Sequence, residues 1–287
     1  ATQPPAQPTA PFADSGPACR HDRPVPLQQP EPAPPTVPGQ VPAEQAAQPA
    51  RPAPATRPAA HLRLDAETRA KVHRCVAAFH EPQSAIAEQY RAIRARLIRR
   101  NVHSENQSLL ITSALAGEGK TVTTANLAVI FAEVPDHRIL MVDANLRAGR
   151  LAKLFGTADQ PGLAELLLAA TELDDAIQPT VIPGLYIIPA GRLHRRHSTR
   201  ELLGSGQAVR LLQELRRRFH YTLLDAPAIK AGPDAIELGR LCTGVLMAVR
   251  ADETAEKAAR QAVEQLRKAD VELLGCVLAA HREETTW

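Results

Sequence analysis

The chain has 287 residues, of which 44% are hydrophobic and 23% are charged, and its formal net charge is +3. So small a net charge does not indicate nucleic-acid binding, and we expect none. The sequence contains no run of about 18 apolar residues and no apolar core of a signal peptide, so it predicts neither a membrane span nor a secretory leader. The four cysteines form no C-x-x-C pair and are typical of reduced thiols, which favours the cytoplasm.

Residues 1–60 consist mainly of Pro, Ala, Gln and Thr. Such a segment buries too little apolar surface to offset the entropy that it would lose on ordering. We therefore predict a disordered, proline-rich tail over 1–60 and a folded domain over 61–287. A plain spacer is the simplest role for the tail, and a tether or a ligand for a proline-binding domain is the alternative.

Two helices are predicted at the start of the folded domain, in the part that spans 61–104. The pattern over 64–79 favours one amphipathic helix, which Pro82 ends. Ser84 begins a second helix, which runs to Arg100. Its apolar face is predicted at helical spacing from Ile86, Tyr90, Ile93 and Leu97.

The second of these helices carries an E-x-x-R-x-x-R pattern formed by Glu88, Arg91 and Arg94. The simplest interpretation is a solvated helix surface with one i,i+3 ion pair, which stabilises a helix by only a few tenths of a kcal/mol. The alternative is a contact between subunits.

The stretch from Ser108 to Val122 reads S-L-L-I-T-S-A-L-A-G-E-G-K-T-V and predicts a strand, a phosphate-binding loop and the start of a helix. Glycines let the backbone approach phosphate oxygens, and the N–H groups at a helix N-terminus attract the anion. Lys120 is expected to reach the phosphates and Thr121 to hold Mg²⁺. Ala114 stands where the full pattern has its first glycine, and a glycine-rich turn of another kind of α/β protein is the alternative. The expected nucleotide contacts are Ala116, Gly117, Glu118, Gly119, Lys120, Thr121 and Val122.

Apolar runs alternate with helical patterns through the nucleotide-binding core that we predict over 105–280. Besides the strand before the loop, strands are expected at 138–142, 185–189, 222–224, 244–249 and 271–278. Helices are expected at 123–132, 148–155, 163–170, 200–218, 234–241 and 254–269. Continuous apolar strands that alternate with helices are typical of a parallel sheet covered on both faces. We therefore predict the three-layer αβα fold of a P-loop NTPase, with a mostly parallel central sheet.

Two of these strands end in an acid, one in Asp143 and the other in Asp225. Ligands of such sheets bind at the carboxyl ends of the strands, where an acid beside a phosphate loop is the usual means of holding Mg²⁺. The predicted metal site consists of Thr121, Asp143 and Asp225. A single Asp at the end of a strand can also cap a helix, so the prediction of a metal site depends on the presence of both acids.

The loop over 191–200 reads G-R-L-H-R-R-H-S-T-R and is strongly basic. A solvated loop is the simplest interpretation, and a contact to phosphate or to an acidic partner is the alternative.

Taken together, these motifs resemble the bacterial tyrosine kinases (BY-kinases) of exopolysaccharide and capsule assembly, close to the exosortase-associated autokinases. The resemblance covers about 61–278 and includes A-E-Q-Y-R-A-I-R, S-A-L-A-G-E-G-K-T-V-T-T-A-N-L-A, V-D-A-N-L-R, L-F-G, P-G-L-A-E-L-L, I-I-P-A-G and L-D-A-P.

The resemblance implies an ATP- and Mg²⁺-dependent protein-tyrosine kinase or autokinase. Its catalytic residues would be Lys120, Asp143 and Asp225. It would form a homo-oligomeric ring through Glu88, Arg91 and Arg94. It would act at the inner face of the plasma membrane through a transmembrane polysaccharide co-polymerase.

The chain departs from the usual family pattern in several places. Asn145 replaces the second acid of the D-x-D-x-R motif, and an amide cannot accept a proton from a tyrosine hydroxyl. Ala228 replaces a second proline, and Ala279 and Ala280 follow Leu278 where relatives usually have an asparagine. The sequence contains three tyrosines and no C-terminal tyrosine cluster. An ATP-binding regulator with little tyrosine transfer is therefore the second hypothesis.

A third hypothesis is a partition-type ATPase. Those proteins share the fold, but their phosphate loop carries an extra lysine where this chain has Leu115, which weighs against it.

Overall fold

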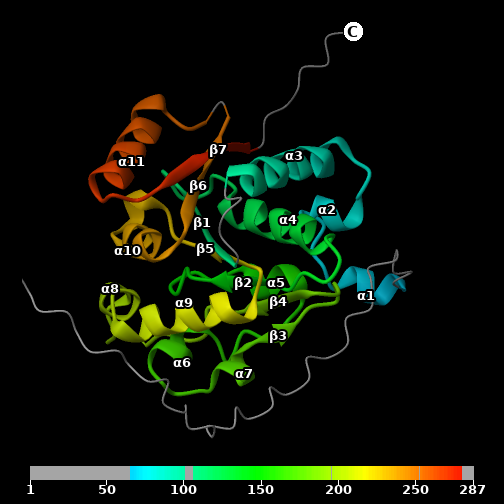
Figure 1. The fold of residues 1–287 in the computed structure, drawn as a ribbon, viewed down its shortest axis with the longest axis horizontal. Helices are drawn as coiled ribbons and strands as arrows, with labels where there is room; N and C mark the ends of the chain where they lie inside the picture. Colours follow the sequence, from blue (N-terminus) through cyan, green and yellow to red (C-terminus); the bar gives the residue numbers. More distant parts are fainter. Residues whose placement is uncertain (1–64, 101–105, 195, 252, 280–287) are drawn as a thin grey trace, which may run out of the picture. The chain divides into compact units, whose positions relative to one another are not determined.

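The computed structural model describes residues 65–100, 106–194, 196–251 and 253–279. The tail predicted over 1–60 lies outside these residues, so its disorder stays a prediction. Every element described below belongs to the folded part of the chain (Figure 1).

The centre of the domain is a seven-stranded sheet with the order β3-β4-β2-β5-β1-β6-β7. All neighbouring strands are parallel except β3 and β4, which pair antiparallel. This arrangement confirms the predicted α/β fold with a mostly parallel sheet. The strands are β1 (Gln107–Ser113), β2 (Ile139–Asp143), β3 (Gln178–Pro179), β4 (Leu185–Ile188), β5 (Tyr221–Asp225), β6 (Gly244–Arg250) and β7 (Leu273–Ala279).

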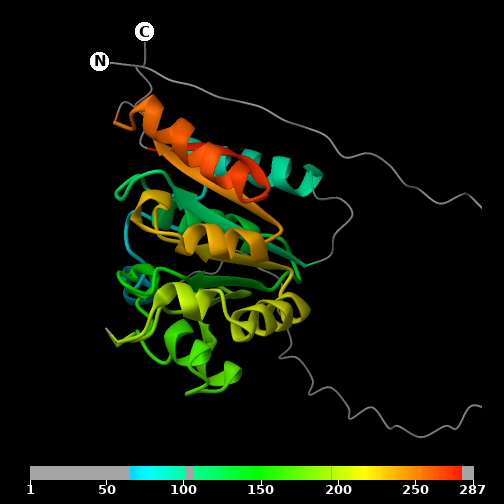
Figure 2. The same cartoon turned by 90° about the vertical axis from the view of Figure 1, so that its left-hand side faces the viewer.

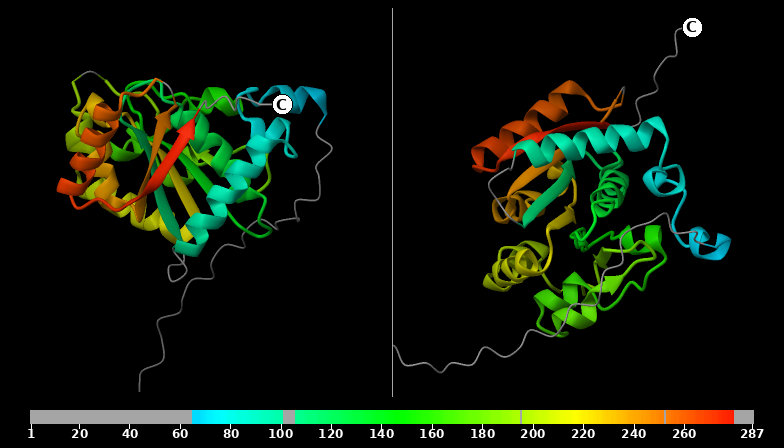
Figure 3. Two further views of the ribbon diagram at one scale, coloured as in Figure 1. Left: turned by 90° about the horizontal axis from the view of Figure 1, so that it is seen from above. Right: turned by 45° about the vertical axis from the view of Figure 1, so that its right-hand side comes forward.

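Helices cover both faces of the sheet, and Figure 3 (left) shows the strands between the two layers. One layer contains α2 (Ala77–His80), α3 (Ala85–Arg100), α4 (Lys120–Ala132) and α5 (Leu151–Phe155). The other contains α6 (Leu163–Leu167), α8 (Thr199–Leu203), α9 (Gly206–Arg218), α10 (Asp234–Leu241) and α11 (Glu256–Lys268). In Figure 2 the helices α9, α10 and α11 lie in front of the strands. The remaining short elements are α1 (Ala66–Ala70), α7 (Leu173–Ala176) and the 3₁₀ turn η1 (Ile229–Ala231).

The hydrophobic core is divided between the two faces because successive side chains of a strand point to opposite sides. Within β1, Leu109 and Ile111 pack with α4 on one face, whereas Leu110 packs on the other. All three side chains are fully buried, as the continuous apolar run predicts. The sheet therefore holds the phosphate loop, which follows β1 directly, on a rigid base.

The helix predicted over 64–79 is wrong, because the chain forms two short helices there instead. The Asp65 carboxylate accepts from the Thr68 backbone N–H at 2.6 Å and caps α1. The backbone N–H of His73 then donates to the Leu154 carbonyl at 2.8 Å, which is a bond to another segment rather than within a helix. The chain turns at this point and resumes as α2. The predicted helix from Ser84 to Arg100 is confirmed as α3.

The long helix predicted over 200–218 is also divided, at Gly204. The Ser198 hydroxyl caps α8, and the Ser205 hydroxyl caps α9 by accepting from the Ala208 N–H at 3.2 Å. Two N-caps so close together favour two helices over one. The helix predicted over 148–155 begins later, at Leu151. No prediction covered α7, β3 or η1.

No helix in the described part of the chain combines the length and the apolar character that crossing a membrane would need.

Candidate functional site

The phosphate loop joins the end of β1 to the first turn of α4. Gly117 has φ +87° and Gly119 has φ +85°, so both adopt the left-handed conformation that favours glycine. A Cβ at Gly119 would lie 3.1 Å from the Ala279 side chain, at the end of β7. Both glycines of the predicted G-E-G-K-T core are thus required by the backbone of the loop.

Glu118 lies between these glycines, and its side chain is directed into the protein and is only 4% exposed. One carboxylate oxygen accepts from the Leu115 N–H at 2.9 Å, and the other accepts from the Thr254 hydroxyl. The Arg250 guanidinium also donates to the Gly117 carbonyl at 3.3 Å. The side chain of Glu118 therefore supports the loop, which leaves only its backbone available for the predicted nucleotide contact.

Replacing Glu118 with Ala is expected to destabilise the domain by about 1–3 kcal/mol, because the Leu115 N–H loses its partner. Urea unfolding of the unliganded protein measures this. The matched control is Glu256→Ala, which removes an exposed carboxylate paired with Arg260 and should change stability by less than about 0.5 kcal/mol. Equal effects of the two substitutions would contradict the supporting role.

Asp143 and Asp225 stand side by side at the carboxyl ends of β2 and β5, where they are paired in register. Each is 1% exposed. Burial raises the pKa of Asp225 to about 7, the charge of Asp143 raises it as well, and Thr121 and Lys120 act in the opposite direction. Oδ1 of Asp225 is buried and has no hydrogen-bond partner among the described residues. A buried carboxylate oxygen without a partner suits a Mg²⁺ ligand, directly or through water.

The carboxylate of Asp143 is engaged differently. Its Oδ2 accepts from the backbone N–H groups of Arg150 at 2.7 Å and Leu151 at 2.9 Å, and its Oδ1 accepts from Asn145 at 3.2 Å. Burial raises the pKa of Asp143, and these hydrogen bonds oppose the shift. The bonds to Arg150 and Leu151 also explain why α5 begins at Leu151: the acid at the end of β2 caps that helix from a distance. Asp143 therefore shapes the loop beside the site, and of the two acids Asp225 is better placed to hold a metal.

Two details of this loop were missed by sequence reasoning. A Cβ at Gly149 would lie 2.4 Å from the Ala190 side chain and 3.0 Å from Oδ2 of Asp143, so the loop passes over the acid only because this residue is glycine. The side-chain amide of Asn145 donates to the Ala148 carbonyl at 3.3 Å and stabilises the turn. A lone glycine and an amide in a short loop give no pattern that identifies either role.

Lys120 and Thr121 occupy the first turn of α4, and Lys120 is only 9% exposed. Burial raises the pKa of both acids, and the charge of Lys120 partly opposes this rise. A hydrogen bond from the Thr121 side chain also opposes the rise in the pKa of Asp225. The structure thus brings the predicted lysine, threonine and both strand-end acids together at one edge of the sheet.

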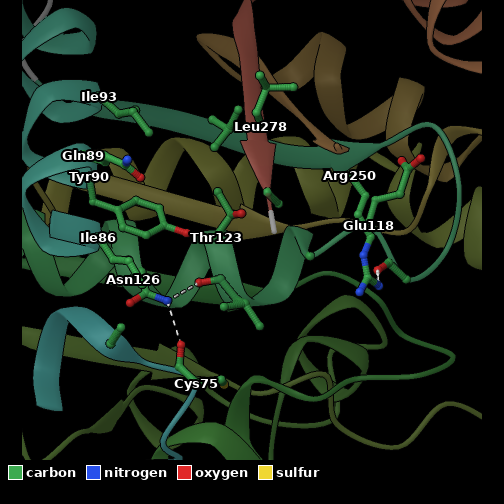
Figure 4. Close-up of a pocket in the computed structure, with 16 residues that line it drawn as sticks. Cys75, Ile86, Gln89, Tyr90, Ile93, Glu118, Thr123, Asn126, Arg250 and Leu278 are labelled. Atoms are coloured by element: carbon green, nitrogen blue, oxygen red, sulfur yellow. Dashed lines mark hydrogen bonds between the residues drawn. The ribbon is translucent and has the colours of Figure 1, made fainter. Parts of the chain in front are cut away.

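A cavity of about 520 Å³ lies next to the loop, between α3, α4 and the end of β7 (Figure 4). Gly117, Gly119 and Val122 line it on the loop side, and Tyr90 and Ile93 line it from α3. A pocket of this size and apolar character is suited to a small organic ligand. The predicted apolar face of α3 only partly packs: Leu97 is buried, whereas Ile86 is 49% exposed at the cavity.

The arginines of the E-x-x-R-x-x-R pattern contact a residue of the same chain, Glu133 at the end of α4. Nε and Nη2 of Arg91 donate to the two carboxylate oxygens of Glu133 at 2.9 and 2.5 Å. Arg94 donates to the Ile130 carbonyl and lies 3.4 Å from Glu133. The hydrogen bonds that Arg91 makes, first to Glu133 and then to Glu88, raise the pKa of Arg91. Glu88 lies 2.5 Å from Arg91, and its side chain is 66% exposed.

The three tyrosines all lie within regular elements. Tyr90 belongs to α3, where burial raises the pKa of its hydroxyl, and Tyr221 belongs to β5 and packs against Phe131 with ring centroids 4.2 Å apart. Tyr186 belongs to β4 and faces the Arg138 guanidinium at 5.2 Å. Each of the three is partly buried, and that none of them is a free phosphate acceptor stays a prediction.

A parallel αβα sheet with a glycine-rich loop, a lysine at the start of the next helix and two strand-end acids defines a P-loop nucleotide-binding domain. Residues 107–273, more than half of the chain, match the family described as "Cellulose biosynthesis protein BcsQ". The chain is 32% identical over 208 residues to tyrosine-protein kinase YwqD of Bacillus subtilis (strain 168), covering 72% of this chain and 86% of the relative. It is 30% identical over 198 residues to the succinoglycan biosynthesis transport protein ExoP of Rhizobium meliloti (strain 1021).

Among solved structures, the kinase domain of Escherichia coli tyrosine kinase ETK is similar to the chain with a TM-score of 0.67 and 27% identity. That match covers 74% of this chain and 84% of the kinase domain. The chain therefore belongs to the P-loop family of BcsQ and the bacterial tyrosine kinases of polysaccharide biosynthesis, as the sequence motifs indicate.

The relatives differ in how much of their length the chain covers. It spans 86% of YwqD, but 69% of the chain corresponds to only 25% of ExoP. For this chain, the activities and partners of such longer proteins are therefore proposals.

Proposed function

We propose that the chain is an ATP-dependent protein-tyrosine kinase that regulates exopolysaccharide polymerisation or export. The observation that carries the proposal is Asp225: a buried carboxylate with an oxygen that lacks a partner in the described structure, beside the phosphate loop. Such a carboxylate is costly to keep unless a cation compensates it when the site is in use. Membership of a family with named tyrosine kinases supports the choice of reaction.

In the proposed mechanism, the backbone N–H groups of the loop and Lys120 hold the phosphates of ATP, and the neighbouring cavity accepts the base. Thr121 and Asp225 would hold Mg²⁺, which would neutralise charge on the phosphates. The phenol oxygen of a tyrosine attacks the γ-phosphorus, the bond to the bridging oxygen of ADP breaks, and the phenol proton passes to a carboxylate. Asp143, with its raised pKa, is the proposed acceptor.

The second candidate is a nucleotide-binding regulator of the same machinery that transfers little phosphate. It is favoured by the hydrogen bonds of Asp143, whose oxygens already accept from three backbone N–H groups. It is also favoured by Asn145, whose amide is used within a turn. Of the two carboxylates in the usual D-x-D motif, which could accept the tyrosine proton, the first is already hydrogen-bonded as Asp143 and the second is replaced by Asn145.

Incubation with γ-labelled ATP and Mg²⁺ separates the two candidates, with phosphate mapped by residue type on the chain and on added partner segments. We expect label on tyrosine that falls at least about 100-fold in Lys120→Ala, because the lysine stabilises charge on the phosphates. Lys257→Ala, which changes an exposed lysine of α11, is the control for the loss of a lysine. Binding of ATP without tyrosine label would favour the regulator.

The partner we propose is a transmembrane polysaccharide co-polymerase, which would keep the chain at the inner face of the plasma membrane. This proposal is supported by relatives such as ExoP, whose name refers to transport in succinoglycan biosynthesis. Assembly into a homo-oligomer through the α3 pattern is part of the same proposal, with Glu88 as its exposed residue.

A further inference from the structure

A second cavity, of about 360 Å³, opens beside Asp143 and is lined by no residue of the phosphate loop. Arg147, Lys153 and Arg192 line it, and all three are exposed. None of the three forms an ion pair with another residue that the structure describes. Asp159 is the exposed acid that also lines this cavity. The rim of the cavity therefore carries an excess of uncompensated positive charge.

Two further hollows, of about 570 and 580 Å³, continue this surface. Arg147 lines the first hollow as well as the cavity, and Arg192 lines the second as well as the cavity. His194 and His197 line both hollows, and Arg196 lines the second. We call this continuous surface the basic groove and define it by Arg147, Lys153, Arg192, His194, Arg196 and His197.

The backbone of the groove is fixed by contacts with the rest of the domain. Glu165 accepts from the Arg192 N–H with one carboxylate oxygen and from the Gly162 N–H with the other, each at 2.9 Å. Gly191 adopts φ +73°, and a Cβ there would lie 1.9 Å from the Glu165 carboxylate. Arg147 donates to the buried Thr199 hydroxyl at 3.0 Å. The charged side chains are therefore presented by a preorganised surface, which reduces the entropy lost on binding.

The tyrosines of the chain give a reason for a docking surface at this place. All three are held within α3, β4 and β5 and are partly buried. If the site transfers phosphate to tyrosine, the acceptor must come from a separate segment. That segment needs a route to Asp143, and the cavity beside Asp143 provides one.

We infer that the basic groove binds an acidic peptide segment of the protein substrate and places its acceptor residue in the cavity beside Asp143. The inference rests on the proposed kinase function and adds the class of substrate. Clustered cations that form no ion pair within the described part of the chain attract Asp- and Glu-rich segments and repel basic ones. The groove thereby selects the substrate by charge rather than by shape alone.

The test measures binding of two fluorescent peptides by anisotropy to the full chain with ADP and Mg²⁺. One peptide has a central Tyr flanked by four Glu on each side, and the other has Gln in place of every Glu. We expect the acidic peptide to bind at least about tenfold more tightly at low salt, with the preference falling as salt rises. Arg192→Gln with Arg196→Gln should remove most of this preference. The control with the same charge change is Arg260→Gln with Arg267→Gln on α11.

Three results would overturn the inference: equal affinity for the two peptides, equal losses in the two double variants, or displacement of the acidic peptide by millimolar inorganic phosphate. The last would mean a site for small anions only. Binding of a fluorescent ATP analogue is measured in parallel and should be the same in both double variants. A groove that binds the acidic peptide without any phosphate transfer would contradict the kinase proposal but support the docking surface, so the two failures are distinguishable.

Discussion

Replacing Asp225 with Asn is expected to abolish Mg²⁺-dependent nucleotide binding and at the same time to stabilise the unliganded domain at pH 8. Burial, followed by the charge of Asp143, raises the pKa of Asp225 to about 7. At pH 8 the folded protein therefore holds a buried negative charge, one oxygen of which has no partner in the described structure. The amide of Asn has a similar shape and no charge, so the substitution removes the cost of burying that charge together with the proposed metal ligand.

The sign of the pH dependence follows from the direction of the shift. In the unfolded chain the Asp225 carboxyl loses its proton near pH 4, whereas in the folded protein it does so near pH 7. Between these values the folded state binds more protons, so the free energy of unfolding falls as pH rises and levels off above about pH 7. A shift of this size corresponds to at most about 4 kcal/mol.

Urea unfolding of the wild type and Asp225→Asn at pH 5 and pH 8 measures this effect. We expect the variant to be more stable than the wild type by about 1–3 kcal/mol at pH 8 and to lose most of this advantage at pH 5. Isothermal titration with Mg²⁺ and ADP measures the loss of binding. A variant that is less stable than the wild type at pH 8 would contradict the assignment of an uncompensated charge.

Asp143→Asn is the matched comparison, because the two acids are neighbours with different surroundings. Its carboxylate accepts from three backbone N–H groups through two oxygens, whereas an Asn side chain has only one acceptor oxygen, so its NH₂ group faces at least one of these N–H groups. The same isosteric change should therefore destabilise the protein by about 1–3 kcal/mol at pH 5 and by less at pH 8, where it also removes the repulsion between the two charges. The chemical change is the same at both positions. Opposite effects on the free energy of unfolding would therefore distinguish Asp143, which shapes the loop, from Asp225, the acid proposed to hold the metal.

Much of the fold could be predicted from the sequence because its strands are buried on both faces. Apolar runs such as the one before Asp143 have few alternatives to a buried strand, and each predicted strand was found within a few residues. The phosphate loop could be predicted because the left-handed backbone at Gly117 and Gly119 needs glycine. Strand-end acids meet at one edge of a parallel sheet, so the pairing of Asp143 with Asp225 follows from the topology.

Contacts between distant segments could not be predicted in the same way. The helix predicted over 64–79 is broken by a hydrogen bond from His73 to Leu154, which no local pattern encodes. The side chain of Glu118 reaches Thr254, more than a hundred residues away in the sequence. Likewise, the sequence shows Arg91 three residues from Glu88 but gives no indication that its principal partner is Glu133. In each case the partner is determined by tertiary packing.

Reversing the charge of Glu133 is expected to destabilise the chain itself, whereas reversing Glu88 is expected to affect only contacts between copies. Glu133 receives a bidentate bond from Arg91, and the two side chains are 31% and 25% exposed. Glu133→Arg places a third cation beside Arg91 and Arg94, so we expect a loss of about 1–3 kcal/mol in urea unfolding. Glu88→Arg changes a side chain that is 66% exposed and should cost less than about 1 kcal/mol.

The swapped pair Arg91→Glu with Glu133→Arg makes this comparison decisive, because it restores the ion pair between α3 and α4 with the opposite orientation. We expect it to recover at least half of the stability that Glu133→Arg loses. Light scattering with ATP and Mg²⁺ then reports assembly for each variant. Loss of the oligomer in Glu88→Arg, at unchanged stability, would identify the exposed end of the pattern as the subunit contact. The opposite result would be that Glu133→Arg disrupts assembly while the unfolding curve stays the same. In that case Arg91 and Arg94 would form the contact between copies, and their bonds to α4 would not hold α3 in place.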